Sequence, residues 1–155
     1  MSITEICQSL DFEILKSIGW LINDAIAYGL ILIALLLIGE KRRDKRTQIL
    51  FSLVLAVLAA LVIKQWMAVE RPCIGEDWCP SGYSFPSTHA VAAFTLMAGF
   101  IRSRNYPYYL LFAVFVAFTR LNLGVHFFQD IVAALPIALV SYYVTRNVMN
   151  DEKGD

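Results

Sequence analysis

The sequence is poor in charged residues, which make up only 17% of its 155 residues, whereas 58% are hydrophobic. Soluble domains usually carry about a quarter of charged residues, so this composition excludes an ordinary soluble domain and predicts a single membrane domain. The formal net charge is zero, and the basic residues are divided among short loops, which argues against a nucleic-acid partner. No internal repeat, low-complexity linker or cleavable signal peptide is evident.

Histidine and cysteine are also scarce, with two and three residues respectively. No cluster of acidic residues suited to magnesium is present. Cys73 and Cys79 are separated by five residues that include a glycine, so a disulfide and two free thiols are both compatible with the sequence. Asn23 and Asp24 interrupt an apolar run near its outer end, where an ionisable residue is a candidate for a functional role, and a helix cap or a bond to Lys64 is the alternative.

Long apolar runs are abundant, and they predict an all-α integral membrane bundle that forms one domain over residues 1–155. The five expected transmembrane helices are 19–39, 48–69, 88–101, 107–121 and 126–148. The third and fourth are shorter than the roughly 20 residues that cross a bilayer, so we expect them inside the bundle. Residues 1–18 carry apolar side chains at helical spacing and predict an amphipathic helix that lies on the membrane surface.

The basic loops predict the orientation of the chain. Nine of the thirteen lysines and arginines fall on one side of the expected membrane, and the positive-inside rule assigns that side to the cytoplasm. Residues 70–86 and 122–125 then lie on the extracytoplasmic side. Four basic residues fall toward that side against the general bias: Lys16, Lys64, Arg71 and Arg120. A functional requirement for positive charge would explain this exception.

Residues 119–130 place an arginine, a histidine and an aspartate between two long apolar runs. If a helix begins near His126, Asp130 follows on the same face four residues later, and its carboxylate can accept a hydrogen bond from the imidazole. Such a pair can orient and activate a base or a nucleophile. The alternative is a histidine at the membrane edge whose helical neighbour merely satisfies its ring nitrogen.

Two further polar groups border the apolar runs. Lys64 and Arg71 are seven residues apart at the end of an expected helix, so both can contact one phosphate, and snorkelling of both side chains at the membrane edge is the alternative. Ser87 follows a proline and predicts a helix start, at which the amides of Ser87, Thr88 and His89 would be free to bind an anion. An ordinary serine cap is the alternative.

The alternating direction of the expected helices brings these groups to one face of the membrane. The residues that meet there are Lys64, Arg71, Ser87, His89, Arg120, His126 and Asp130. Three cations, a helix N-terminus and both histidines together predict a site for phosphoryl transfer. In such a site, one histidine attacks phosphorus and the other protonates the leaving oxygen.

Three motifs resemble the signatures of the type 2 phosphatidic acid phosphatase family, in the same order. This family of membrane lipid phosphatases shares its fold with vanadium haloperoxidases and bacterial acid phosphatases. The motifs are Lys64 separated by six residues from Arg71-Pro72, then Pro86-Ser87-Thr88-His89, then Thr119-Arg120 separated by five residues from His126, which three further residues separate from Asp130. The resemblance covers residues 64–130.

The resemblance implies that His126 becomes phosphohistidine, that Asp130 orients it and that His89 protonates the leaving group. The residues that it implies for phosphate binding are Lys64, Arg71, Ser87, Thr88 through its amide, and Arg120. It implies no metal and no cofactor. The chain has Thr88 and Thr119 where the family usually has glycine and serine. Thr88 would crowd the phosphate and alter which head groups fit, whereas Thr119 keeps the hydroxyl.

We therefore expect a metal-independent membrane lipid phosphatase whose site faces away from the cytoplasm. Its expected substrate is a polyprenyl diphosphate of the undecaprenyl or dolichyl type, because such carriers are released on the outer face and the short helices would leave a lateral opening for a long tail. The alternative is a phosphatidylglycerophosphate or broad phosphatidic acid phosphatase. A non-catalytic lipid binder or transporter is a lesser alternative, since it would not require both histidines. The oligomeric state is not indicated.

Overall fold

The computed structural model describes residues 3–9 and 13–151, which form seven helices and contain no strand. The helices are α1 (Ile3–Ser9), α2 (Glu13–Asn23), α3 (Ala25–Gly39), α4 (Arg43–Met67), α5 (Thr88–Gly99), α6 (Tyr106–Asn122) and α7 (Phe128–Asp151). The predicted all-α architecture is confirmed.

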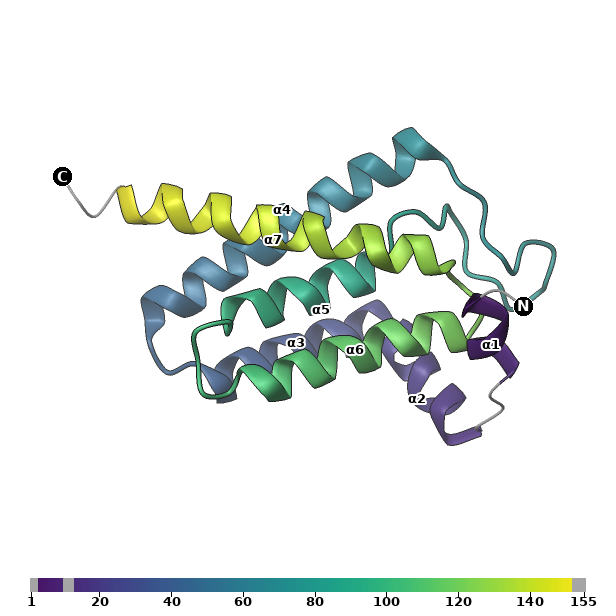
Figure 1. Cartoon of the computed structure of the whole chain (residues 1–155), viewed down its shortest axis with the longest axis horizontal. Coiled ribbons are helices and arrows are strands. Elements are labelled where there is room, and N and C mark those ends of the chain that lie inside the picture. Colours follow the sequence, from purple (N-terminus) through teal and green to yellow (C-terminus); the bar gives the residue numbers. More distant parts are fainter. Residues whose placement is uncertain (1–2, 10–12, 152–155) are drawn as a thin grey trace.

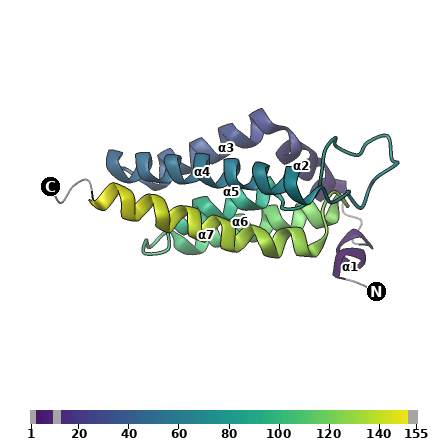
Figure 2. The same cartoon turned by 90° about the horizontal axis from the view of Figure 1, so that it is seen from above.

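The helices form a bundle around α5. This helix packs against α4, α6 and α7, and it lies near the middle of the bundle in Figure 1 and in the perpendicular view of Figure 2. One end of the bundle carries α1, α2, the α4–α5 loop and the α6–α7 turn. The α3–α4 and α5–α6 connections lie at the opposite end (Figure 1).

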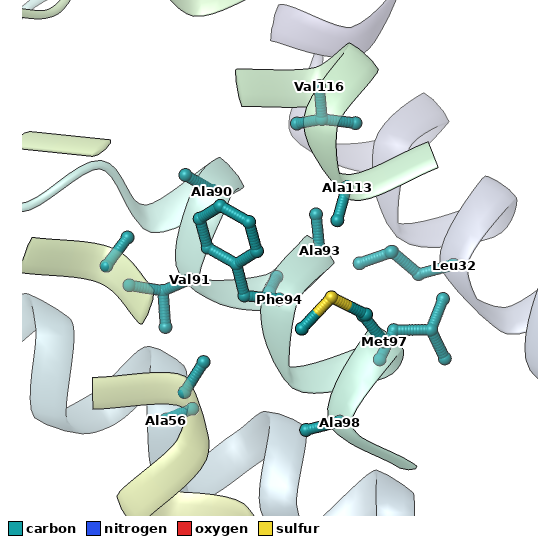
Figure 3. Close-up of a cluster of buried hydrophobic side chains, with 14 of the residues drawn as sticks. Leu32, Ala56, Ala90, Val91, Ala93, Phe94, Met97, Ala98, Ala113 and Val116 are labelled. Atoms are coloured by element: carbon teal, nitrogen blue, oxygen red, sulfur yellow. The ribbon is translucent and has the colours of Figure 1, made fainter. Parts of the chain in front are cut away.

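The composition of α5 explains its central position. Its residues from 90 to 99 are all buried, as expected for a helix that is apolar on every face. Small residues let the neighbouring helices approach closely. A Cβ atom added to Gly99 would lie 2.7 Å from the side chain of Ile49 on α4. Figure 3 shows Phe94 and Met97 of α5 between small and branched side chains of the surrounding helices.

Two helices, α4 and α7, are each long and apolar enough to cross a membrane. The pair α2 and α3 meets the same criterion only as one broken span that is bent by 90°, and α5 is a shorter apolar helix. By length and composition, the described residues thus contain two helices that could cross a membrane, or three if the bent pair is one span, and the expected number of five stays a prediction. Large exposed apolar side chains along them, such as Val62, Ile26 and Val140, suit contact with lipid.

The N-terminal helices differ from the sequence prediction. The segment 19–39 was expected to be one straight helix, but it is divided at Asp24, where the chain turns by 90°. Asp24 has extended backbone angles, and its Oδ1 atom accepts the Ala27 amide at 2.8 Å as the N-cap of α3. Of the helix expected over 1–18, residues 1–2 and 10–12 lie outside the described residues, and the rest belongs to α1 and to α2, which continues to Asn23.

The α4–α5 loop is tied down at several points. A disulfide joins Cys73 to Cys79, which resolves the alternative that the sequence left open. The amide of Ser84 donates to the carbonyl of Val69 at 2.8 Å, and its buried hydroxyl donates to the carbonyl of Glu70 at 3.0 Å. These bonds hold the end of the loop against its beginning, next to the C-terminus of α4.

Candidate active site

The residues singled out from the sequence lie at one end of the bundle, each near a helix terminus. Lys64 is in the last turn of α4, and Arg120 is in the last turn of α6. Ser87 is the N-cap of α5, whose first turn contains His89. His126 lies in the turn that precedes α7. The alternating helix directions thus bring together motifs that are far apart in the sequence (Figure 1).

His126 and Asp130 form the hydrogen bond that their spacing predicts. The Nδ1 atom of His126 is 3.1 Å from Oδ2 of Asp130, and both side chains are buried. The same oxygen accepts the backbone amide of Phe127 at 2.9 Å, as first-turn acids do when they reach back to the N-cap. Because α7 begins at Phe128, His126 lies just before the helix, and the helix start positions the acid that orients the imidazole.

The other ring nitrogen of His126 faces Arg71. Its Nε2 atom is 3.5 Å from Nη1 of Arg71, and the guanidinium also donates to the carbonyls of Val125 at 2.9 Å and Gly82 at 3.1 Å. Since the Asp130 carboxylate accepts the proton on Nδ1, the lone pair is on Nε2. Burial lowers the pKa of His126 to about 4, so its imidazole is neutral at neutral pH and can act as a nucleophile.

Lys64 also binds neutral oxygens. Its Nζ atom donates to the carbonyl of Tyr83 at 2.8 Å and to that of Ser84 at 3.0 Å. Both carbonyls belong to the α4–α5 loop, which folds back over the end of α4. The ammonium group is therefore held against the loop that leads into α5, and its charge is not cancelled by a carboxylate.

Arg120 is fully buried and has three acceptors. Nη1 donates to Oδ1 of Asn23 at 3.1 Å, Nη2 donates to the carbonyl of Gly19 at 2.5 Å, and Nε donates to Oγ1 of Thr119 at 3.4 Å. The threonine that replaces the usual serine thus supplies a hydroxyl oxygen to the adjacent arginine. The other two acceptors come from α2, the N-terminal helix that ends at the bend.

The charge balance of this end of the bundle is positive. Among the residues that the structure describes, Lys64, Arg71 and Arg120 form no ion pair with a carboxylate, and Asp130 is the acid that acts on two of them. Three positive charges therefore face one negative charge. A buried excess of cations is costly unless an anion neutralises it, which is the arrangement expected of a phosphate site.

The start of α5 corrects one detail of the prediction. The amide of Ser87 was expected to be free, but it donates to the backbone carbonyl of Asp130 at 3.2 Å. The hydroxyl of Ser87 accepts the Ala90 amide at 3.4 Å as an N-cap. The first-turn amides of Thr88 and His89 have no carbonyl of their own helix to bond, so these two remain suited to an anion.

His89 is positioned by a residue that the sequence did not single out. The hydroxyl of Tyr28 on α3 donates to the His89 carbonyl at 2.8 Å, and the two rings lie 4.9 Å apart between centroids. His89 is also close enough to His126, Arg71 and Arg120 to interact with them electrostatically. An aromatic residue within an apolar helix gives no sequence signal of such a role.

The two polar residues of the first expected helix are also placed. Asp24 is a helix cap, whereas Asn23 binds Arg120, and neither contributes to the hydrogen bonds of Lys64. The position of Asn23 inside an apolar run was the available sequence signal for this contact.

Within residues 3–9 and 13–151, no three histidine, cysteine, aspartate or glutamate side chains are grouped so that they could hold a metal ion.

A cleft of about 690 Å³ lies beside this site. It is bordered by Pro72, which follows Arg71 in the chain, and by Gly124 in the turn that leads to His126. Trp20 of α2 and Trp78 of the α4–α5 loop also line it, with their ring centroids 6.0 Å apart. Lys64, Arg71 and Arg120 do not line this cleft, which adjoins the site through chain neighbours of Arg71 and His126.

Comparison with known proteins identifies the family of the chain and solved structures of similar fold. Residues 45–153 match the family model of the PAP2 superfamily. The chain is similar to the crystal structure of LpxE from Aquifex aeolicus, with a TM-score of 0.76 and 18% identity over 94% of this chain and 93% of that one. It is also similar to a transmembrane PAP2-type phosphatidylglycerolphosphate phosphatase from Bacillus subtilis, with a TM-score of 0.70 and 21% identity over 97% and 83%. No protein of curated function matches the chain.

Proposed function

Because this chain belongs to the PAP2 superfamily, the type 2 phosphatidic acid phosphatase family, we propose that it hydrolyses a lipid phosphate through a phosphohistidine on His126. The observation that carries the proposal is the His126–Asp130 pair, whose unprotonated Nε2 atom faces Arg71 in a cluster of cations without carboxylate partners. A non-catalytic lipid binder would need the cations but not this pair.

In the first step, Nε2 of His126 attacks phosphorus, and the bond from phosphorus to the leaving oxygen breaks. His89 gives its proton to that oxygen, while Asp130 stabilises the positive charge that develops on the attacking imidazole. In the second step, His89 takes a proton from a water molecule that attacks phosphorus. The nitrogen–phosphorus bond then breaks, and inorganic phosphate is released.

The phosphoryl oxygens would be held by Lys64, Arg71 and Arg120, together with the hydroxyl of Ser87 and the amide of Thr88. The cations now donate mainly to carbonyl and amide oxygens. Exchanging some of these neutral acceptors for phosphoryl oxygens would keep the hydrogen bonds and add charge attraction. The attraction would grow as negative charge develops in the transition state, which lowers the barrier. This donor set requires no metal.

We propose that the substrate is a polyprenyl diphosphate, from which the enzyme releases phosphate on the extracytoplasmic face. Two features support this side of the membrane. Nine of the thirteen basic residues lie in segments that the orientation rule assigns to the cytoplasm, and the loop beside the site contains the Cys73–Cys79 disulfide, which is typical of an oxidising compartment.

Phosphatidylglycerophosphate is the second candidate substrate, or more broadly phosphatidic acid and related glycerophospholipids. The observation that favours it is the similarity of the chain to the phosphatidylglycerolphosphate phosphatase of Bacillus subtilis. The cleft beside the site is large enough for a glycerol-containing head group. The two candidates differ in the leaving group, which is a lipid phosphate for the first and an alcohol for the second.

The deciding experiment measures phosphate release in detergent micelles from both substrates, with wild-type protein and His126→Ala. We expect activity that persists in EDTA, competitive inhibition by vanadate, and faster turnover of the polyprenyl diphosphate. Retention of near-normal activity by His126→Ala would refute the phosphohistidine. A clear preference for phosphatidylglycerophosphate would exclude the carrier assignment. Labelling of single cysteines introduced at residues 70–86 tests the orientation, and modification from the cytoplasm would remove its support.

A further inference from the structure

The bent pair α2–α3 contacts the candidate site on both sides of its bend. Asn23 is the last residue of α2, and Tyr28 lies in the first turn of α3. Asn23 binds Arg120 of the third motif, whereas Tyr28 binds His89 of the second motif. Both residues lie outside the residues that match the family model. We propose that this bend forms a further wall of the active site, in which Asn23 positions Arg120 and Tyr28 positions His89.

The fully buried guanidinium of Arg120 lies at the C-terminal end of α2. Arg120 donates to the side chain of Asn23 and to the carbonyl of Gly19 one turn earlier. The C-terminal end of a helix carries partial negative charge and stabilises a nearby cation. Gly19 lets α2 approach, because an added Cβ atom would lie 3.0 Å from Leu123. Asn23 therefore orients the guanidinium with a neutral group that leaves its charge available to an anion.

The contact with His89 fixes both its backbone and its ring. Tyr28 is buried, its hydroxyl donates to the His89 carbonyl at 2.8 Å, and its ring lies against the imidazole with an angle of 44° between the planes. A histidine that transfers a proton must be held within hydrogen-bond reach of the leaving oxygen. Tyr28 restricts both the position of the α5 start and the rotation of the imidazole.

The bend explains how both contacts are possible. Asp24 ends α2 and caps α3 with a turn of 90°, so the two helices approach the site from different directions. A straight helix would place Asn23 and Tyr28 along a single axis, five residues or about 7.5 Å apart. The bend instead directs one residue to the end of α6 and the other to the start of α5.

This inference rests on the proposed function. It assigns different roles to Tyr28 and Asn23, so each role has its own test. Tyr28→Phe should lower kcat about tenfold on phosphatidic acid, whose leaving group needs a proton, and change kcat less than about twofold on p-nitrophenyl phosphate, whose leaving group does not. The matched control is Tyr109→Phe. The hydroxyl of Tyr109 donates to the Leu35 carbonyl at 2.7 Å between α6 and α3, and Tyr109 is similarly buried, but it lies in the first turn of α6, whereas Arg120 is in the last turn of that helix.

Asn23→Asp tests the second role, because it keeps an acceptor for Arg120 but adds a negative charge. We expect the inhibition constant of vanadate and the KM for phosphatidic acid to rise about tenfold, with a thermal midpoint close to that of the wild type. Asn23→Ala should raise both constants by a smaller factor, because it removes one acceptor and adds no charge.

Two outcomes would overturn the inference while the proposed function stands. One is that Tyr28→Phe and Tyr109→Phe lose the same activity on both substrates, which would show a structural role alone. The other is a vanadate constant in Asn23→Asp within about twofold of the wild type. If the wild-type protein releases no phosphate from any substrate, the proposed function itself fails, and this inference fails with it.

Discussion

Basic residues gather at both ends of the bundle, but their partners differ. At the α3–α4 turn, Glu40 pairs with Arg42 at 3.3 Å and with Lys45 at 3.2 Å. We call these three residues the turn cluster. At the opposite end, the site cluster consists of Lys64, Arg71 and Arg120, whose partners are mainly carbonyl and amide oxygens.

The difference separates cations that stabilise a turn from cations that can serve a ligand. In the turn cluster, the carboxylate neutralises positive charge at the membrane edge, and the guanidinium of Arg46 further secures the backbone by donating to the carbonyls of Glu40 and Leu37. In the site cluster, the chain satisfies the donors with neutral oxygens, and the single charge of Asp130 leaves most of the positive charge uncompensated. Hydrogen bonding without neutralisation is what a site that must attract an anion requires.

The largest expected effect comes from Asp130→Asn. Oδ2 of Asp130 accepts both the Phe127 amide and the Nδ1 proton of His126. An asparagine that places its oxygen there keeps both bonds but lacks the negative charge that stabilises the developing imidazolium, whereas one that places its NH₂ group there forces the imidazole proton onto Nε2 and blocks the nucleophile. We expect kcat to fall roughly 10³–10⁴-fold, the size of effect seen when such an acid is replaced by its amide. Phosphate release measures it, with Glu40→Gln in the turn cluster as the control. Activity within tenfold of the wild type would contradict the proposed geometry.

The next effect concerns His89, which has no counterpart in the turn cluster. As a general acid, it should matter most when the leaving group is a poor one. We expect His89→Ala to lower kcat roughly 10²-fold or more on phosphatidic acid, and clearly less on a polyprenyl diphosphate, whose leaving phosphate needs less protonation. Turnover of both lipids by one preparation gives the ratio. Equal losses would mean that His89 only positions the phosphate.

A matched pair of lysines tests the comparison of the two clusters directly. Lys64→Met removes a charge from the site cluster, and we expect kcat/KM to fall roughly 10²-fold, since one donor to transition-state charge contributes about this much. Lys45→Met removes a charge from the turn cluster, where Lys45 pairs with Glu40 and lies 5.5 Å from the ring centroid of Phe100. Its kcat/KM should be unchanged. Similar losses in both variants would show that net charge alone governs activity.

The sequence predicted which polar residues lie together more completely than it predicted the path of the chain. The motif residues have charges and ring nitrogens that are costly in apolar surroundings, so their positions at the ends of apolar runs were informative. Alternating helix direction then placed them at one end. The hydrogen bond between His126 and Asp130 followed from four-residue spacing, although α7 begins only at Phe128.

The parts that were not predicted depend on packing. Lipid tails and a helical core are equally apolar, so hydropathy could not show that α5 is buried on every face, nor how many helices cross the membrane. The bend at Asp24 depends on one cap within an apolar run. The sequence does not distinguish Tyr28 from an aromatic residue of the core. Its contact with His89 depends on the bend at Asp24, which brings the first turn of α3 next to the first turn of α5.

The smallest expected effect concerns the stability of the turn cluster. Burial alone would raise the pKa of Glu40, but hydrogen bonds from Arg42 and Lys45 outweigh it and lower that pKa to about 2. The folded pKa is therefore below the unfolded value of about 4.5. The stabilisation is thus complete above pH 4.5 and is lost as the pH falls toward 2.

The expected size of this stabilisation is about 1 kcal/mol, because Arg42 is largely exposed and water screens the pair. Glu40→Gln should lower the free energy of unfolding by about this much at pH 7 with unchanged phosphatase activity, whereas Glu13→Gln, at an exposed position of α2, should lower it less.

Thermal unfolding in detergent from pH 7 to pH 3 measures the effect. The melting temperatures of the wild type and of Glu40→Gln should converge as the pH falls, because protonation of Glu40 removes from the wild type the negative charge that the substitution has already removed. Curves that stay parallel would mean that Glu40 is not a charged partner of the turn cluster, and the contrast between the two ends of the bundle would then rest on the site cluster alone.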